Sequence, residues 1–313
     1  MRSALHALFD GLIDYAGLYP PAALPMERAL REYAGSLRGQ DGWALNRFVV
    51  PSARLEELGD ALAVLPDALR GTEPWRITVT AGADVMVCAS AADEFAARQG
   101  LASVRVEAVE SLARTPDEVE RARAAVPAAV GLVLELPPGG DLPTLARAVK
   151  SAGGVAKLRA GGVRAADVPP ASAVLEFLSA CAAERLPFKV TAGLHHPVRG
   201  LAPLTYEPGA ERAVLFGYLN LLLAALALGG GAGRGEVLRL LEETDPAAFH
   251  LGDEAIGWRD LRFGAEEVAR TRGAFATVIG SCSFAEPLQE IRQMGARLPR
   301  PARASTRSGG TTS

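Results

Sequence analysis

Cysteine and net charge are both scarce in this chain of 313 residues, and each shortage excludes a class of protein. The three cysteines, Cys88, Cys181 and Cys282, lie far apart and form no C-x-x-C pair. That spacing argues against a disulfide framework or a cysteine-rich zinc site, and it predicts a reducing, cytoplasmic compartment. The formal net charge of −3 provides no basic surface, so we expect no nucleic-acid partner and no binding to an anionic membrane.

A hydrophobic run long enough to span a membrane is also missing. The best candidate, from Ala213 to Gly231, has about 16 mostly apolar residues, fewer than the ~20 that a transmembrane helix needs, and Asn220 interrupts it. We predict a buried or interface helix over 213–228, and a homo-oligomer formed through this helix is one use of such a surface. The N-terminal segment carries acids and no cleavage pattern, so we interpret it as mature protein and not as a signal peptide.

Lysine is rare in this chain, because it supplies only three of the 33 lysine and arginine residues. Lys157 and Lys189 lie inside apolar, strand-like runs, whereas Lys150 has the surroundings of an ordinary helix-surface residue. Arginine keeps its proton in proteins, but a buried lysine beside another cation can lose its proton and become a nucleophile. The two strand lysines are therefore candidates for chemistry, and a structural ion pair with an acid is the alternative for each.

Eight apolar runs rich in β-branched residues predict strands, at 12–18, 46–51, 75–81, 103–110, 131–137, 154–162, 187–196 and 275–284. Helical patterns separate them. Leu55, Leu58 and Leu62 share one helix face, and the stretch Thr115-Pro116-Asp117-Glu118 is a capping box with proline at the first helical position. Alternating strands and helices predict a parallel sheet, and eight such units predict a single-domain (β/α)8 barrel, the TIM-barrel fold, over residues 1–300.

Two segments depart from the regular alternation. A helical insertion at about 201–274 separates the seventh and eighth strands, and its position over or under the active site is left open. The segment 301–313 is low in apolar residues and is expected to be a disordered tail. A doubly wound open sheet is the main alternative fold, but no G-x-G-x-x-G follows the first strand, and the glycines at 229–235 follow a helix instead.

Barrel enzymes carry their chemistry at the C-terminal ends of the strands, where alternate side chains share a face. The catalytic residues predicted on this basis are Glu107 on the fourth strand, Glu135 on the fifth, Lys157 on the sixth, and Lys189 and His195 on the seventh. The predicted substrate-binding residues are Asp14 on the first strand, Arg159 on the sixth, Thr191 and His196 on the seventh, and Ser281 and Ser283 on the eighth.

Several of these residues have structural alternatives. Glu107 is equally well explained by neutralisation through Arg105, two residues away. The two serines precede a helix pattern, so they form either an anion cradle with the helix N-terminus or ordinary caps. Cys282 lies between them and could be a nucleophile, but alternation from Ser281 turns it away from the same face, which favours a buried structural cysteine.

The adjacent histidines His195 and His196 pose a geometric question. On a regular strand they point to opposite sides, but if the chain has already turned toward Pro197, both line the barrel mouth. One of them would then act as an acid/base or substrate-binding group. Both as ligands of one metal is a weaker interpretation, because adjacent positions lack the i, i+4 spacing that aims two imidazoles together.

At "LIDYAGLYPPAALPM", "KLRAGG", "FKVTAGLHHP" and "GSCSFAEP" the chain resembles an uncharacterised bacterial family whose members are taken to be (β/α)8 barrels. That resemblance covers most of the chain and implies a fold but no activity. Over strands five to seven, "LVLEL", "AVKSAGGVAKLRAGG" and "PFKVTAGL" are also loosely similar to class I aldolases of the deoxyribose-phosphate aldolase kind.

The aldolase resemblance implies that Lys157 is the Schiff-base lysine and that Lys189 lowers its pKa. The similarity ends after Lys157, where Leu158 and Arg159 replace the small hydroxyl residues of that family, and Arg159 with His195 suggests a more anionic substrate.

The leading hypothesis is therefore a lyase or aldolase that acts on a small anionic metabolite with a carbonyl group and uses no cofactor. A metal-dependent lyase, isomerase or hydrolase is the first alternative, with a divalent ion on Glu135 or Glu107 and on one or both of the adjacent histidines. A non-catalytic binding barrel, whose polar cluster is a structural ion network, is the second alternative.

Overall fold

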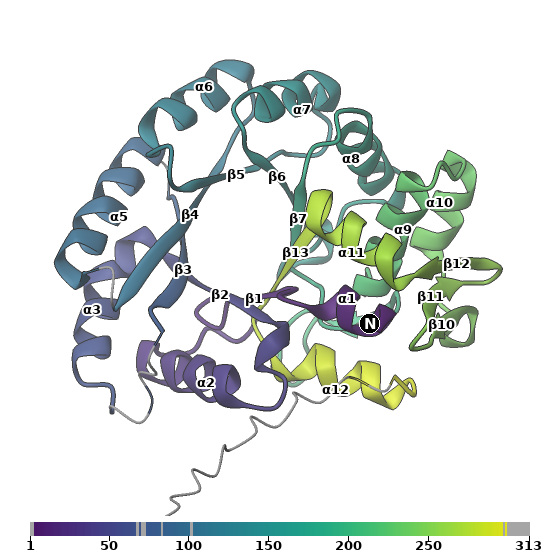
Figure 1. The fold of residues 1–313 in the computed structure, drawn as a ribbon, viewed down its shortest axis with the longest axis horizontal. Helices are drawn as coiled ribbons and strands as arrows, with labels where there is room; N and C mark the ends of the chain where they lie inside the picture. Colours follow the sequence, from purple (N-terminus) through teal and green to yellow (C-terminus); the bar gives the residue numbers. More distant parts are fainter. Residues whose placement is uncertain are drawn as a thin grey trace, which may run out of the picture.

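Eight parallel strands close into a barrel in the computed structural model, which describes residues 3–66, 69, 73–82, 84–100, 103–296 and 298 (Figure 1). The barrel strands are β1 (Ile13–Tyr15), β2 (Leu45–Pro51), β3 (Trp75–Thr80), β4 (Val104–Leu112), β5 (Gly131–Glu135), β6 (Val155–Arg159), β7 (Phe188–Thr191) and β13 (Ala276–Ser281). Around the barrel they follow the order β1-β13-β7-β6-β5-β4-β3-β2. The predicted (β/α)8 barrel is confirmed; the predicted tail at 301–313 lies outside the described residues.

A helix follows each barrel strand and covers the sheet from outside (Figure 1). These helices are α2 (Met26–Arg38), α3 (Leu55–Ala63), α5 (Val85–Gln99), α6 (Pro116–Ala125), α7 (Leu142–Ser151), α8 (Ala171–Ala183), α9 (Tyr218–Gly229) and α12 (Ala285–Gln293). The predicted cap of α6 is confirmed, because the Thr115 side chain accepts a hydrogen bond from the backbone N–H of Glu118. Asp84 and Asp141 cap α5 and α7 in the same way.

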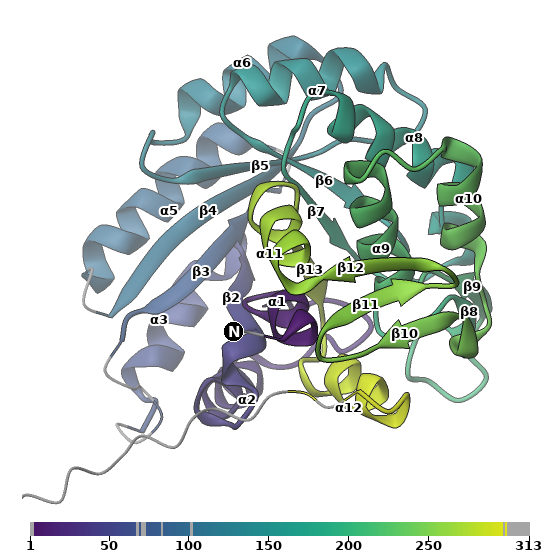
Figure 2. The same cartoon turned by 45° about the vertical axis from the view of Figure 1, so that its right-hand side comes forward.

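The insertion after β7 divides between the two ends of the barrel. Its first part is a hairpin of β8 (Gly200–Pro203) and β9 (Arg212–Leu215), whose Leu204 and Leu215 form a small separate core. Its later part contains α10 (Arg234–Glu242), the sheet β10 (Phe249–Leu251), β11 (Ala255–Trp258) and β12 (Leu261–Gly264), and α11 (Ala265–Ala274). Figure 2 shows this sheet beside α1 (Ala4–Phe9), which precedes β1. The remaining short 3-10 turns are η1 (Gly42–Ala44), η2 (Ser52–Arg54), η3 (Ala165–Asp167) and η4 (Pro246–Ala248).

The apolar stretch after the hairpin is a core helix of this chain. The prediction of one helix over 213–228 was wrong in its first residues, where β9 and a short turn precede α9. The residues of α9 from Tyr218 to Ala227 are all buried, and the helix packs against α8, α10 and α11. Its apolar surface is therefore covered without a second subunit. Among the described helices, none has the length and apolar character that a membrane span requires.

Candidate active site

A linear network of six charged side chains crosses the barrel interior. Its members, in order of contact, are Asp14, Lys189, Glu110, Lys157, Glu135 and Arg159. Lys189 Nζ lies 2.5 Å from Asp14 Oδ2 and 2.5 Å from Glu110 Oε1. Lys157 Nζ lies 2.7 Å from Glu110 Oε2 and 3.2 Å from Glu135 Oε2. Three cations thus alternate with three carboxylates, and we call this set the charged network.

Strand register explains why these side chains meet. Lys157 on β6 is paired directly with Glu135 on β5 and with Lys189 on β7. Parallel neighbours at one level project their side chains to the same side of the sheet. The prediction that the two lysines lie at matching depth is confirmed, but Glu110 lies between their ammonium groups and contacts both.

The charges of the network stabilise one another in a buried setting. Burial alone would raise the pKa of Glu110, but the two lysine ammoniums outweigh it and lower that pKa to about 2. Burial alone would lower the pKa of Lys189, but Asp14 and Glu110 raise it above its ordinary value. Glu135 also has a lowered pKa, because Lys157 and Arg159 outweigh its burial. Lys189 is therefore a fixed cation at neutral pH.

The fourth strand contributes to the charged network a residue that sequence reasoning missed, Glu110. Thr78 on β3 pairs with Ala108, while its neighbour Ile77 pairs with Val106, so Glu107 is the extra residue of a β-bulge. The bulge resets the alternation of side chains along β4. Glu110 consequently points into the barrel, where it contacts the two lysines.

The bulge also takes Glu107 away from the predicted site. Its carboxylate receives hydrogen bonds of 2.8 Å from Arg47 Nε and 2.8 Å from Arg76 Nε, near the start of β2 and β3. These two arginines, and not Arg105, are its partners. Glu107 borders neither of the cavities described below. It is a structural ion-pair partner, and its predicted catalytic role is not supported by its position.

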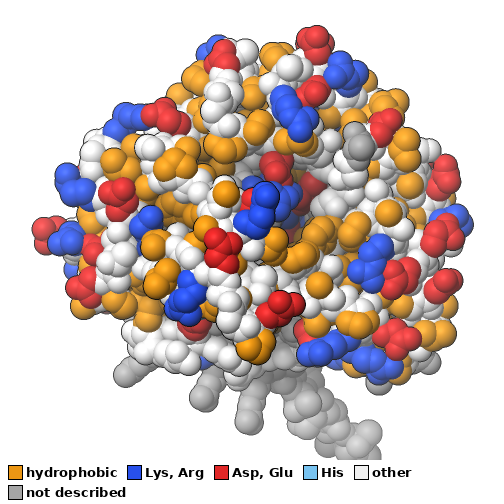
Figure 3. All heavy atoms as spheres, turned by 180° about the vertical axis from the view of Figure 1, so that it is seen from behind, with side chains coloured by type: hydrophobic (Ala, Val, Ile, Leu, Met, Phe, Trp, Pro, Cys, Tyr) orange, Lys and Arg blue, Asp and Glu red, His pale blue; other side chains and the backbone are white. Residues whose placement is uncertain are grey.

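A cavity of about 620 Å³ lies at the C-terminal ends of the strands, over the charged network. Its lining includes Tyr19, Lys157, Arg159, Thr191 and Cys282. The face turned away from the viewer in Figure 1 is shown in Figure 3, where a central hollow contains acidic and basic side chains. The β8–β9 hairpin contributes Leu204, Thr205 and Tyr206 to the lining, so part of the insertion caps the mouth.

Both adjacent histidines reach this mouth cavity, because β7 ends at Thr191 and the chain then turns. Ala192 and Gly193 have φ values of 67° and 72°, in the left-handed region. The backbones of Gly193 and Gly161 are also in close contact, because a Cβ atom added to Gly161 would lie 3.1 Å from the Cα of Gly193. After this turn each histidine pairs with a glutamate of α12.

The two histidine–glutamate pairs are one helical turn apart. His195 Nδ1 lies 2.8 Å from Glu286 Oε2, and His196 Nδ1 lies 2.8 Å from Glu290 Oε1. The opposite ring nitrogen of His195, Nε2, lies 3.6 Å from Cys282 Sγ. Burial alone would lower the pKa of His195, but Cys282 and Glu286 outweigh it and raise that pKa to about 10. The ring of His195 is therefore protonated at neutral pH.

The eighth strand differs from expectation at its end. Cys282 is buried as predicted, but the prediction that it faces away from the site was wrong, because β13 ends at Ser281 and regular alternation does not extend to the next residue. The two serines instead serve the turn into α12. Ser281 Oγ accepts a hydrogen bond from the Ser283 N–H, and Ser283 Oγ accepts one from the Glu286 N–H. Both serines therefore have structural hydrogen bonds here, within the turn for Ser281 and to the first turn of α12 for Ser283, although the N-cap residue Phe284 makes no side-chain cap.

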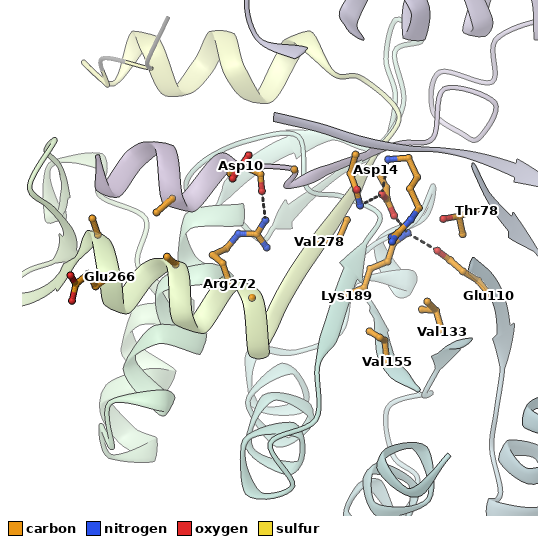
Figure 4. A pocket seen from close by; sticks show the side chains of 17 residues that line it. Asp10, Asp14, Thr78, Glu110, Val133, Val155, Lys189, Glu266, Arg272 and Val278 are labelled. Carbon is orange, nitrogen blue, oxygen red and sulfur yellow. Dashed lines mark hydrogen bonds and ion pairs between the residues drawn. The ribbon is translucent and has the colours of Figure 1, made fainter. Parts of the chain in front are cut away.

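A second cavity, of about 610 Å³, lies at the other end of the barrel beneath α1 and α11. Figure 4 shows Lys189 between Asp14 and Glu110 at its inner end. Glu110 and Lys189 border both cavities, so the charged network separates them. Asp14 borders only this second cavity, and its Oδ1 accepts hydrogen bonds from the Asn46 side chain and the Arg47 N–H. Asp14 therefore positions Lys189 instead of reaching the mouth.

The ligands proposed for a divalent ion are not gathered at one point. Glu135 pairs with Lys157 and Arg159, while each histidine pairs with its own glutamate on α12. Within the described part of the chain, no group of three or more His, Cys, Asp or Glu side chains is placed to hold a metal ion.

Comparison of the sequence with protein-family models and with curated proteins found no match. The resemblances noted from the sequence stay predictions, and the function must be argued from the geometry of the site.

Proposed function

We propose that the protein is a lyase of the aldolase type, in which Lys157 forms an imine with a small anionic carbonyl compound. The observation that carries this proposal is the single carboxylate, Glu110, held between the ammonium groups of Lys157 and Lys189. Both lysines border the mouth cavity, but Lys157 does so beside Arg159 and is the more exposed of the two. Lys189 is more deeply buried, also borders the second cavity, and contacts two carboxylates.

Imine formation at Lys157 conserves charge, which suits this network. An ammonium and a carbonyl compound give a protonated imine and one water, so the positive charge stays on the same nitrogen. Glu110 takes up one proton as the amine attacks and returns it to the departing oxygen. Because Glu110 and Glu135 contact the Lys157 nitrogen, they stabilise the protonated imine as they stabilise the ammonium.

The protonated imine then accepts the electron pair of the carbon–carbon bond that breaks. Glu135, at the end of β5, takes the proton of the substrate hydroxyl whose oxygen becomes the new carbonyl. The resulting enamine is protonated on carbon, and water releases the second product from Lys157. Arg159 is half exposed at the mouth and binds the carboxylate or phosphate of the substrate.

Borohydride trapping tests the proposal directly. The full chain is incubated with a panel of aldehydes and keto acids, reduced with borohydride and mapped by mass spectrometry. We expect one stable adduct, on the peptide that contains Lys157. Lys157→Arg should keep the fold and lose at least ~10³-fold in adduct formation, since a guanidinium cannot serve as the nucleophile.

Lys150→Arg is the matched control, because Lys150 Nζ donates only to the Arg185 carbonyl on the helix surface. It should trap substrate as the wild type does. Retained lyase activity in Lys157→Arg would rule out imine chemistry at this residue. Elemental analysis of the same preparation distinguishes the lysine mechanism from the metal-dependent alternative. Finding one equivalent of zinc, manganese or iron per chain that is lost in His195→Gln would contradict the lysine mechanism.

A further inference from the structure

We propose that Cys282, His195 and Glu286 form a second reactive centre in the mouth cavity, a thiol nucleophile with its acid–base partner, which accepts an acyl group from an activated ester or thioester. This centre is separate from the charged network and does not depend on the imine chemistry. The three side chains come from three different segments that meet at the mouth: the end of β13, the turn after β7 and the first turn of α12.

The contacts have the order of a nucleophile, a base and an orienting acid. Glu286 Oε2 lies 2.8 Å from His195 Nδ1, which leaves Nε2 directed at Cys282 Sγ, 3.6 Å away. A carboxylate on one imidazole nitrogen fixes the ring so that the other nitrogen serves the nucleophile. Tyr206 of the hairpin donates to the same Glu286 oxygen at 3.0 Å and contacts Cys282 Sγ at 3.8 Å. All four residues line the mouth cavity, which puts the centre next to the space that a ligand would occupy.

The other two cysteines provide an internal comparison. Cys88 and Cys181 are buried in the helices α5 and α8, and neither borders the mouth cavity. Burial raises the pKa of the Cys88 thiol to about 11 and also raises that of Cys181. Of the three described cysteines, only Cys282 has an imidazole at hydrogen-bonding distance.

The chemical step transfers an acyl group to sulfur. The reacting pair is the thiolate of Cys282 beside the imidazolium of His195. The sulfur attacks the carbonyl carbon, the bond from that carbon to the leaving oxygen or sulfur breaks, and His195 gives its proton to the leaving group. The products are an alcohol or thiol, a thioester on Cys282 and a neutral His195. Water then attacks the thioester while His195 accepts one of its protons, and the carbon–sulfur bond breaks, which releases a carboxylic acid and restores the thiolate and the imidazolium.

The probe for this centre is 4-nitrophenyl acetate, added to the full chain. We expect a burst of about one nitrophenolate per chain, as an acyl-enzyme accumulates, and an acetyl group on the peptide that contains Cys282. Cys282→Ser should reduce the burst rate by at least ~100-fold. Glu286→Gln should reduce it by about tenfold, because His195 loses its orienting partner. Glu290→Gln, which alters the neighbouring histidine–glutamate pair, is the control and should leave the burst rate unchanged.

A second measurement uses only the wild-type chain, so it tests the proposal even if the variants fold poorly. Iodoacetamide at pH 6 should alkylate Cys282 of the folded wild type at least about tenfold faster than the cysteines of the urea-unfolded chain, because only in the folded protein does the His195 ring lie beside its sulfur. Acetylation of Lys157 instead of Cys282, a full burst in Cys282→Ser, or alkylation no faster than in the unfolded chain would each overturn the proposal.

Discussion

Glu110 organises the barrel interior at the level of single atoms, since each of its two carboxylate oxygens holds one lysine. Such a residue is costly to bury alone, and the two ammonium groups offset that cost. If the charge of Glu110 is removed, Lys157 and Lys189 each lose one carboxylate partner. The stability of the fold and the proposed chemistry therefore depend on the same side chain.

Replacing Glu110 by glutamine should lower the free energy of unfolding at pH 7 by about 3 kcal/mol, the value of a pKa depressed from 4.5 to about 2. A group whose pKa is depressed in the folded state stabilises the protein above the unfolded pKa and loses that effect as pH falls through the folded pKa. Wild-type stability should therefore fall between pH 4.5 and pH 2, and more steeply than that of Glu110→Gln. Urea unfolding at several pH values measures both effects.

Glu94→Gln is the control for that comparison, since Glu94 is exposed on α5 and only accepts from Ser90. Equal acid sensitivity of Glu110→Gln and the wild type would show that Glu110 does not carry the effect.

Among the helices, α12 is connected to the barrel mouth by two side-chain pairs. Its first turn and its second turn each present a glutamate to one of the adjacent histidines after β7. The helix is thereby fixed against the barrel mouth at two successive turns. In the structure each of the adjacent histidines pairs with its own glutamate of this helix.

The attachment of α12 should weaken in alkaline solution. The pKa of His195 is raised to about 10, so its ion pairing with Glu286 stabilises the fold fully below its unfolded pKa of about 6.5. That contribution is lost as pH rises toward 10, where Cys282 and Tyr206 are the other titratable groups facing the ring. We expect the thermal midpoint of the wild type to fall more between pH 7 and pH 10 than that of His195→Gln. Parallel curves for the two proteins would contradict this assignment.

The elements also show where sequence reasoning succeeds and where it stops. All eight strands were predictable because β-branched runs and helical periodicity are local signals, and the depth of Lys157 and Lys189 followed from counting along neighbouring strands. Glu110 was missed because a bulge, which depends on the neighbouring strand, resets the alternation.

Cys282 was misplaced for a related reason, since the end of β13 is set by tertiary packing. The four-residue spacing of Glu286 and Glu290 was a usable signal, because it puts both on one helix face toward two adjacent histidines. Their partner loop, however, is about 90 residues away in the chain, so sequence spacing alone does not pair them.

At the scale of the whole molecule, the barrel is closed differently at its two ends. The mouth is covered by the hairpin, while the other end is covered by α1 and α11. Arg272 of α11 joins the latter two helices, because its Nε donates to the Leu8 carbonyl and its Nη2 donates to the Asp10 carbonyl (Figure 4). Burial lowers the pKa of Arg272 to about 10, so it remains a cation at neutral pH.

Arg272→Met should therefore loosen this end of the barrel. We expect a loss of about 3 kcal/mol in the free energy of unfolding, since buried carbonyls lose charged donors, and faster proteolysis of the N-terminal segment in the folded protein. Arg270→Met, on the exposed side of the same helix, is the control. Unchanged proteolysis in Arg272→Met would show that the other contacts of α1, which include the hydrogen bond from the Ala4 N–H to the Asp253 carbonyl, hold it without Arg272.

The two ends of the β8–β9 hairpin lie next to each other at the barrel mouth. Gly200 and Leu215 are paired neighbours, so the residues between them are connected to the rest of the chain through two adjacent positions. A stretch attached in this way can change in length or composition while β7 and α9 keep their positions. Its Tyr206 nevertheless reaches over the cavity to Glu286. The lysines of the proposed imine chemistry thus belong to the strands, whereas this part of the cavity wall belongs to one short hairpin, so a change in the hairpin can reshape the cavity without moving Lys157.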